Sequence, residues 1–153
     1  MTSHNAISAR VARIEAGDDP LLLAELGSGY AVFAKYQPTP VRGGCMLLPR
    51  TVVASPNDLS GPERERFFGD LMLLGDAILA VTGAQRVNYL VLCNQVPELH
   101  GHGIPRFAEE DPVKRLQGPF EAYDFAQAPL ADPEAGDREL IDRLRAELAG
   151  QHS

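Results

Sequence analysis

The sequence has little cysteine, and the cysteine that it has forms no motif. Cys45 and Cys93 stand far apart and make no Cys-x-x-Cys pair. Paired, closely spaced cysteines are what a disulfide framework or a redox motif requires. The expectation is therefore a reduced protein of the cytoplasm, with nothing in the spacing to support a disulfide.

Basic side chains and long apolar runs are also scarce. The chain has 14 Lys and Arg against 21 Asp and Glu, a net charge of −7. This argues against a basic surface for a nucleic acid polymer or for anionic lipid, although a few local donors could hold a small anionic ligand. No apolar run is long enough to cross a membrane. Residues 1–6 lack the basic and apolar stretches of a secretory signal.

The 153 residues fit a single domain, 1–153, with a hydrophobic content of 44% that allows a true core. Ile7, Val11 and Ile14 recur at helical spacing and predict an N-terminal helix over 6–15. Short apolar runs predict strands over 30–34, 45–48, 87–92 and 98–104, the last antiparallel to the one before it. The fold class is α+β, an antiparallel sheet with one main helix between strand pairs.

The main helix is expected over 61–82. Ser60 and Glu63 form the Ser-x-x-Glu pattern of a capping box, and Pro62 suits the first turn. Gly83 supplies a C-terminal stop. The apolar stripe between these ends predicts packing against the sheet.

The chain changes character after Arg106. Residues 108–136 are rich in Pro, Asp, Glu and Ala and predict a long ordered arm, followed by a C-terminal helix over 137–149. The arm contains Phe120, Tyr123 and Phe125. These rings are expected to cover a partner subunit or the protomer's own sheet rather than to form a substrate lid.

Two of the four histidines, His100 and His102, alternate with glycine after the apolar run that ends at Leu92. Alternate residues of a strand point to one face, so Glu98, His100 and His102 are expected to form one row. An imidazole is a good nucleophile when an acceptor holds one ring nitrogen and leaves the lone pair of the other free. Asn94 and Gln95, in the preceding turn, can donate to developing negative charge.

The row permits other interpretations. His-x-His on a strand can bind zinc, with Glu98 or a distant residue as the third ligand. Both histidines can also be incidental surface or core residues. From spacing alone, nucleophile, metal ligand and incidental histidine all stay open.

The order of several segments resembles the histidine triad (HIT) superfamily, which carries three alternating histidines on a strand, often followed by Pro-Arg. The matching string runs from Glu98 to Arg106. The segments Leu47–Arg50 and Asp58–Glu63 resemble the strand end and helix start of that family, and Asn94–Pro97 is similar to a bacterial HIT-like branch.

This resemblance implies a HIT-like fold of about five antiparallel strands with N- and C-terminal helices, usually in a homodimer. It implies a nucleotide or dinucleotide ligand, with neither metal nor cofactor. His100 matches the nucleophile that forms a nucleotidyl-histidine intermediate, and His102 matches the third histidine. The implied activity is hydrolysis or transfer at a phosphoramidate or dinucleoside polyphosphate. The expected nucleotide- and phosphate-binding positions are Asn94, Gln95, Glu98 and Gln37.

Two departures from the family pattern leave an alternative, a weakly active or inactive nucleotide-binding or interaction protein on the same scaffold. Glu98 stands where the family has its first histidine, and its charge would favour a protonated imidazole that cannot attack. Gly101 and Gly103 replace bulkier residues. They require either a closely packed neighbour or a looser site.

Overall fold

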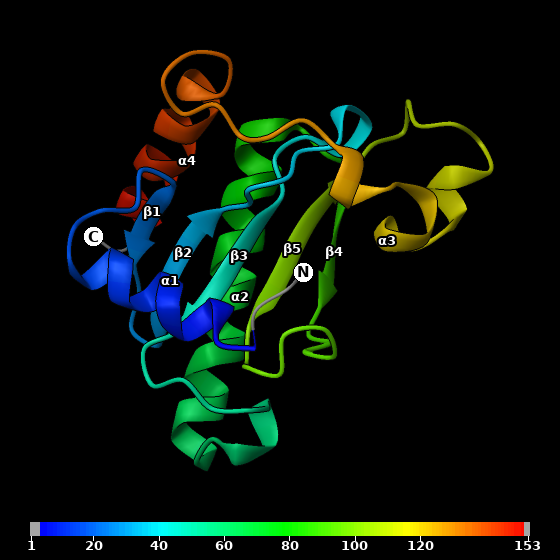
Figure 1. Cartoon of the computed structure of the whole chain (residues 1–153). Helices are drawn as coiled ribbons and strands as arrows, with labels where there is room; N and C mark the ends of the chain where they lie inside the picture. Colours follow the sequence, from blue (N-terminus) through cyan, green and yellow to red (C-terminus); the bar gives the residue numbers. More distant parts are fainter. Residues whose placement is uncertain (1–3, 152–153) are drawn as a thin grey trace.

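An antiparallel sheet of five strands organises the chain, which the computed structural model describes from residue 4 to residue 151 (Figure 1). Residues 1–3 and 152–153 of the expected domain lie outside the described part. The sheet has the order β1-β2-β3-β5-β4. Its strands are β1 (Leu22–Glu25), β2 (Gly29–Phe33), β3 (Cys45–Pro49), β4 (Arg86–Leu90) and β5 (Gly101–Arg106).

Helices cover both faces of this sheet, as Figure 1 shows. Helix α1 (Ala6–Glu15) covers one face, and α2 (Gly61–Thr82) and α4 (Arg138–Gln151) cover the other. The short helix α3 (Pro119–Ala122) lies beside the sheet (Figure 1). Alternate strand residues point to opposite faces. Phe33 and Leu47 pack with α2 and α4, whereas Tyr30, Val32 and Leu48 pack with α1. In the part of the chain that the structure describes, no helix is long and apolar enough to span a membrane.

Local sequence signals correctly predict α1 and α2. Ile7, Val11 and Ile14 are the buried residues of α1. Helix α2 runs over the expected 22 residues, with both hydrogen bonds of the Ser60–Glu63 capping box formed. Gly83 ends it in the left-handed region, at φ 69°. Caps and periodicity suffice for α2 because they are contained in the segment itself.

The strand expected over 98–104 is wrong at its start. It pairs antiparallel with β4, as predicted, but it begins only at Gly101. Before that point the Glu98 N–H donates to the carbonyl of Val96 at 2.8 Å, and the Leu99 N–H donates to Val53 at 2.7 Å. The chain therefore turns at Glu98, which lies outside β5.

Gly101 and Gly103 lie where α2 packs directly on β5. A Cβ atom on Gly101 would lie 3.2 Å from both methyl carbons of Leu71, and one on Gly103 would lie 3.2 Å from Ile78. Of the two alternatives that the glycines raised, the structure has the closely packed neighbour.

The segment 108–136 folds back on the rest of the chain. It contains α3 and three-residue 3-10 helices at Lys114–Leu116 and Phe125–Gln127. Its end returns to the sheet, where the Ala131 N–H donates to Lys35 at 2.7 Å and the Gln37 N–H donates to Pro129 at 2.8 Å. The following helix α4 starts one residue later than expected and extends to Gln151.

Candidate functional site

The structure brings His100 and His102 together at the start of β5. His102 pairs with Met46 of β3 and Leu90 of β4, and His100 directly precedes the strand. The two rings meet edge to face, with centroids 5.1 Å apart. His100 is 9% exposed, so its ring is held in a nearly closed environment.

A backbone carbonyl orients the His100 ring. The Nδ1 atom of His100 lies 2.7 Å from the carbonyl oxygen of Glu98. A carbonyl can only accept, so Nδ1 carries the hydrogen. In the neutral ring the lone pair then resides on Nε2. This is the arrangement that a nucleophilic imidazole needs.

The side chain of Glu98 turns to the start of α1. Its Oε1 accepts hydrogen bonds from the backbone N–H groups of Ile7 and Ser8, each at 3.1 Å, and its Oε2 contacts the Ser8 hydroxyl. Glu98 is expected at the nucleotide, yet its carboxylate is engaged by a helix N-terminus. A helix N-terminus favours negative charge, which accounts for this location.

His102 sits in an apolar environment. Burial, with a smaller contribution from the neighbouring His100, lowers its pKa from 6.5 to about 4. The ring of Phe120 lies against it, with centroids 5.2 Å apart, and Phe125 lies against Phe120 at 4.8 Å. His102 is therefore neutral at physiological pH and can donate one hydrogen bond without carrying charge.

A cavity of about 1460 Å³ opens beside the two histidines. Its walls come from α1, from the turn after β4, from one face of the sheet and from the arm. Asn94 and Gln95 line it together with His100 and His102, and both are exposed. The sequence-predicted turn and histidines thus converge on one cavity.

Gln37 does not line this cavity. Its buried amide donates to the carbonyls of Ala34 and Gly44 and accepts from the Gly43 N–H, all at 2.9 Å. These contacts brace the loop between β2 and β3. They favour a structural role for Gln37 over the expected contact with a nucleotide.

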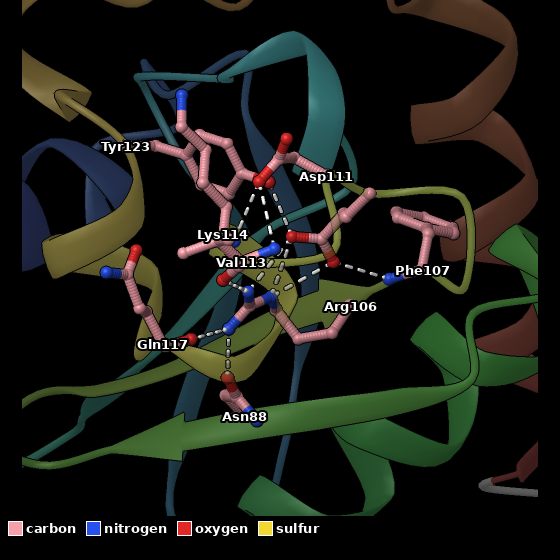
Figure 2. Close-up of polar contacts among 9 residues, drawn as sticks. Asn88, Arg106, Phe107, Asp111, Val113, Lys114, Gln117 and Tyr123 are labelled. Carbon is pink, nitrogen blue, oxygen red and sulfur yellow. Dashed lines mark hydrogen bonds and ion pairs between the residues drawn. The ribbon is translucent and has the colours of Figure 1, made fainter.

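Arg106 points into the base of the arm (Figure 2). Its guanidinium pairs with Glu110 at 2.9 Å and donates to Asn88 and to the carbonyls of Lys114 and Gln117. The Tyr123 hydroxyl donates to the same Glu110 carboxylate at 2.6 Å. The network fixes the fold of the arm and leaves Arg106 no free donor for a ligand.

Sequence reasoning missed two parts of the site. Phe120 and Phe125 line the cavity, and Phe120 lies against His102 of the sheet, whereas the arm's aromatic residues are expected only to cover the sheet or a partner subunit. Helix α1 forms another wall, through residues that include Arg10 and Arg13. Neither contact has a local sequence signal, because both join segments that are far apart in the chain.

No metal-binding cluster is found within residues 4–151, where no three His, Cys, Asp or Glu residues are grouped to hold an ion. The third ligand considered for a zinc site, Glu98, is turned to α1 instead.

No protein-family profile matches the chain, and no curated protein sequence matches it. Solved structures do match. A histidine triad (HIT) protein from Sinorhizobium meliloti is 22% identical with a TM-score of 0.69, over 83% of this chain and 88% of that one. A histidine triad protein from Marinobacter aquaeolei is 18% identical with a TM-score of 0.68, over 93% and 94%.

A hypothetical histidine triad nucleotide-binding protein from Sulfolobus tokodaii is 14% identical with a TM-score of 0.69, over 93% of this chain and 92% of that one. At such identities the shared property is the fold. The chain has the α+β fold of histidine triad proteins, with a five-stranded antiparallel sheet and helices on both of its faces.

Proposed function

We propose that this protein binds a nucleotide and hydrolyses or transfers it through His100. The observation that carries the proposal is the 2.7 Å contact between His100 Nδ1 and the Glu98 carbonyl, which leaves Nε2 as a free nucleophile beside the cavity. The nucleotide-binding description of the Sulfolobus tokodaii structural neighbour supports the class of ligand.

The reaction proceeds in two displacements. Nε2 of His100 attacks the α-phosphorus of a phosphoramidate or dinucleoside polyphosphate, a P–N bond forms, and the leaving group departs with the electron pair of its bond to phosphorus. An amine leaving group takes up a proton from solvent as it departs. Water then attacks the phosphorus, the P–N bond breaks, the nucleoside monophosphate leaves and one proton is released. Asn94 and Gln95 donate hydrogen bonds to the phosphoryl oxygens as charge develops.

The rest of the cavity suits a nucleotide in size and chemistry. Its volume of about 1460 Å³ lies above the range of a typical small-ligand site, which favours a ligand as large as a dinucleotide. Phe120 and Phe125 offer apolar surface to a base or ribose, and Arg13 and Lys35 line the same cavity as cations for phosphates.

The test compares the wild-type protein with His100→Ala in assays on adenosine phosphoramidate and on diadenosine polyphosphates. Loss of a covalent nucleophile is expected to lower kcat by at least about 10³-fold. Trapping a nucleotidyl adduct by mass spectrometry in the wild type would locate the P–N bond. Equal hydrolysis by wild type and His100→Ala would overturn the proposal.

A second candidate is a nucleotide-binding or interaction protein without turnover. The observation that favours it is the carboxylate residue Glu98 at the position of the family's first histidine. Titration calorimetry separates the two candidates. This candidate would be supported if the wild type hydrolyses neither substrate but binds a nucleoside monophosphate, and if His100→Ala weakens that binding.

We further propose that the protein is a cytoplasmic homodimer of single-domain protomers. The edge strand β4 and the adjacent face of α2 support the dimer. Phe68, Met72 and Tyr89 are exposed there, and the Tyr89 hydroxyl lies directly over Gly75 of α2, which makes the apolar surface continuous. Such a surface suits a second copy of the chain.

A further inference from the structure

Helix α1 begins without a cap of its own. Its N-cap residue, Asn5, makes no side-chain capping hydrogen bond, and its first turn contains no acidic residue. Glu98, 93 residues after Asn5, supplies a side-chain acceptor at this helix start. Its carboxylate accepts from the backbone N–H groups of Ile7 and Ser8, which are the N2 and N3 positions that a capping side chain normally serves.

The main chain of the same residue holds the His100 ring. The Glu98 carbonyl accepts from His100 Nδ1 at 2.7 Å. The peptide units on either side are also fixed, since the Glu98 N–H donates to Val96 and the Leu99 N–H donates to Val53. Leu99 itself is fully buried in the core. Glu98 thus binds α1 with its side chain and the imidazole with its carbonyl.

We propose that Glu98 is a positioning residue that couples α1 to the orientation of His100. The proposal rests on the proposed function, because it assigns the role of the residue at the position of the missing histidine. The carboxylate fixes α1, which forms a wall of the cavity, and the anchored side chain restrains the peptide whose carbonyl sets the His100 tautomer. The charge of Glu98 is engaged by the N–H groups of α1, and Glu98 itself does not line the cavity.

The test uses Glu98→Ala and Glu98→Gln, with readouts that do not require turnover. In Glu98→Ala, hydrogen exchange at the Ile7 and Ser8 amides is expected to become roughly tenfold faster, because their acceptor is lost. Long-range ¹H–¹⁵N spectra should show His100 moving from a single Nδ1–H tautomer to a mixture. Glu98→Gln should retain most of both properties, because its amide oxygen can still accept the two hydrogen bonds.

Activity is the second readout. Glu98→Ala is expected to lower kcat roughly tenfold with a smaller change in KM, because a misaligned nucleophile reacts more slowly although the substrate still binds. Glu98→Gln is expected to retain most of the wild-type kcat. Should the wild type hydrolyse no nucleotide, the proposed function fails. The exchange and tautomer measurements still decide the coupling.

Glu63→Ala is the matched control. Glu63 completes the capping box of α2, and it does not line the cavity. Its substitution should speed exchange at the start of α2 and leave the His100 spectrum and kcat unchanged. The coupling is overturned if Glu98→Ala leaves the Ile7 and Ser8 amides protected and the His100 tautomer intact, or if Glu63→Ala alters His100 equally.

Discussion

At the scale of single residues, Gly101 decides how closely α2 approaches the histidine strand. A Cβ atom there would lie 3.2 Å from Leu71 and 3.6 Å from Phe67. The 3.6 Å distance to Phe67 is an ordinary contact, but the 3.2 Å distance requires Leu71 to shift, and fully buried Leu71 has little room for that.

We therefore expect Gly101→Ala to lower the free energy of unfolding by about 1–3 kcal/mol, the usual cost of overpacking a core. Gly69→Ala on α2 is the control. A Cβ atom on Gly69 meets nothing within 4 Å, so this variant should gain about 0.5–1 kcal/mol from helix propensity. Urea denaturation measures both, and an unchanged midpoint for Gly101→Ala would contradict the packing argument.

A second residue-scale prediction concerns His102, whose burial lowers its pKa from 6.5 to about 4. The folded state disfavours the charged ring. His102 therefore contributes stability above the ordinary histidine pKa, and this contribution is lost as the pH falls toward 4. Removing the neighbouring ring in Phe120→Ala should admit water and raise the pKa toward its ordinary value.

An NMR titration of the His102 ring measures this change directly. Leu116→Ala serves as the control, because Leu116 lies on the same arm but is 84% exposed. A titration midpoint that is the same in Phe120→Ala and the wild type would show that Phe120 does not shield His102.

At the scale of elements, the arm depends on one buried ion pair. The side chains of Arg106 and Glu110 are only 5% and 1% exposed. Burial opposes ionisation of Glu110, but hydrogen bonds from Arg106, Tyr123 and the Phe107 N–H outweigh it and lower its pKa. The pair thereby holds the arm that carries Phe120 and Phe125 to the cavity.

Glu110→Gln should cost about 3–5 kcal/mol at neutral pH, because it leaves the buried Arg106 charge without its partner. Because the folded pKa of Glu110 is lowered, the wild type gains this stability above the unfolded-state pKa and loses it as the pH falls through the folded value. Urea titrations at about pH 7 and about pH 3 measure this. Between these two pH values the free energy of unfolding should fall less in the variant than in the wild type.

The exposed pair of Arg50 and Glu25 offers the matched control for this prediction. Glu25→Gln should change stability by less than about 1 kcal/mol, since solvent screens the pair. Equal losses for Glu110→Gln and Glu25→Gln would mean that the Arg106 network does not hold the arm.

At the scale of the whole molecule, the proposed dimer predicts a solution mass of twice the 16.6 kDa of one chain. Met72→Glu places a charge in the proposed apolar interface and should shift the protein to a monomer, because an unpaired charge there must be desolvated. Leu116→Glu, on the exposed arm, should leave the mass unchanged. Light scattering measures all three proteins, and a monomeric wild type would contradict the dimer.

Local sequence determined much of the fold. Helix α2, with its Ser60–Glu63 capping box and the Gly83 stop, could be predicted because all of its signals lie within the segment or next to it. The same is true of the periodic burial of Ile7, Val11 and Ile14 in α1, and of β4 pairing antiparallel with β5. The convergence of Asn94 with His100 also followed from chain order, since one short turn separates them.

Only the tertiary structure decided where Glu98 points, what packs on Gly101 and which rings face His102. Each of these contacts joins residues far apart in the chain, so no pattern within one segment specifies it. The sequence by itself determined that an imidazole follows a polar turn and precedes a strand. Only the tertiary structure decided that the Glu98 carbonyl orients the His100 ring, and that the Glu98 carboxylate caps the start of α1.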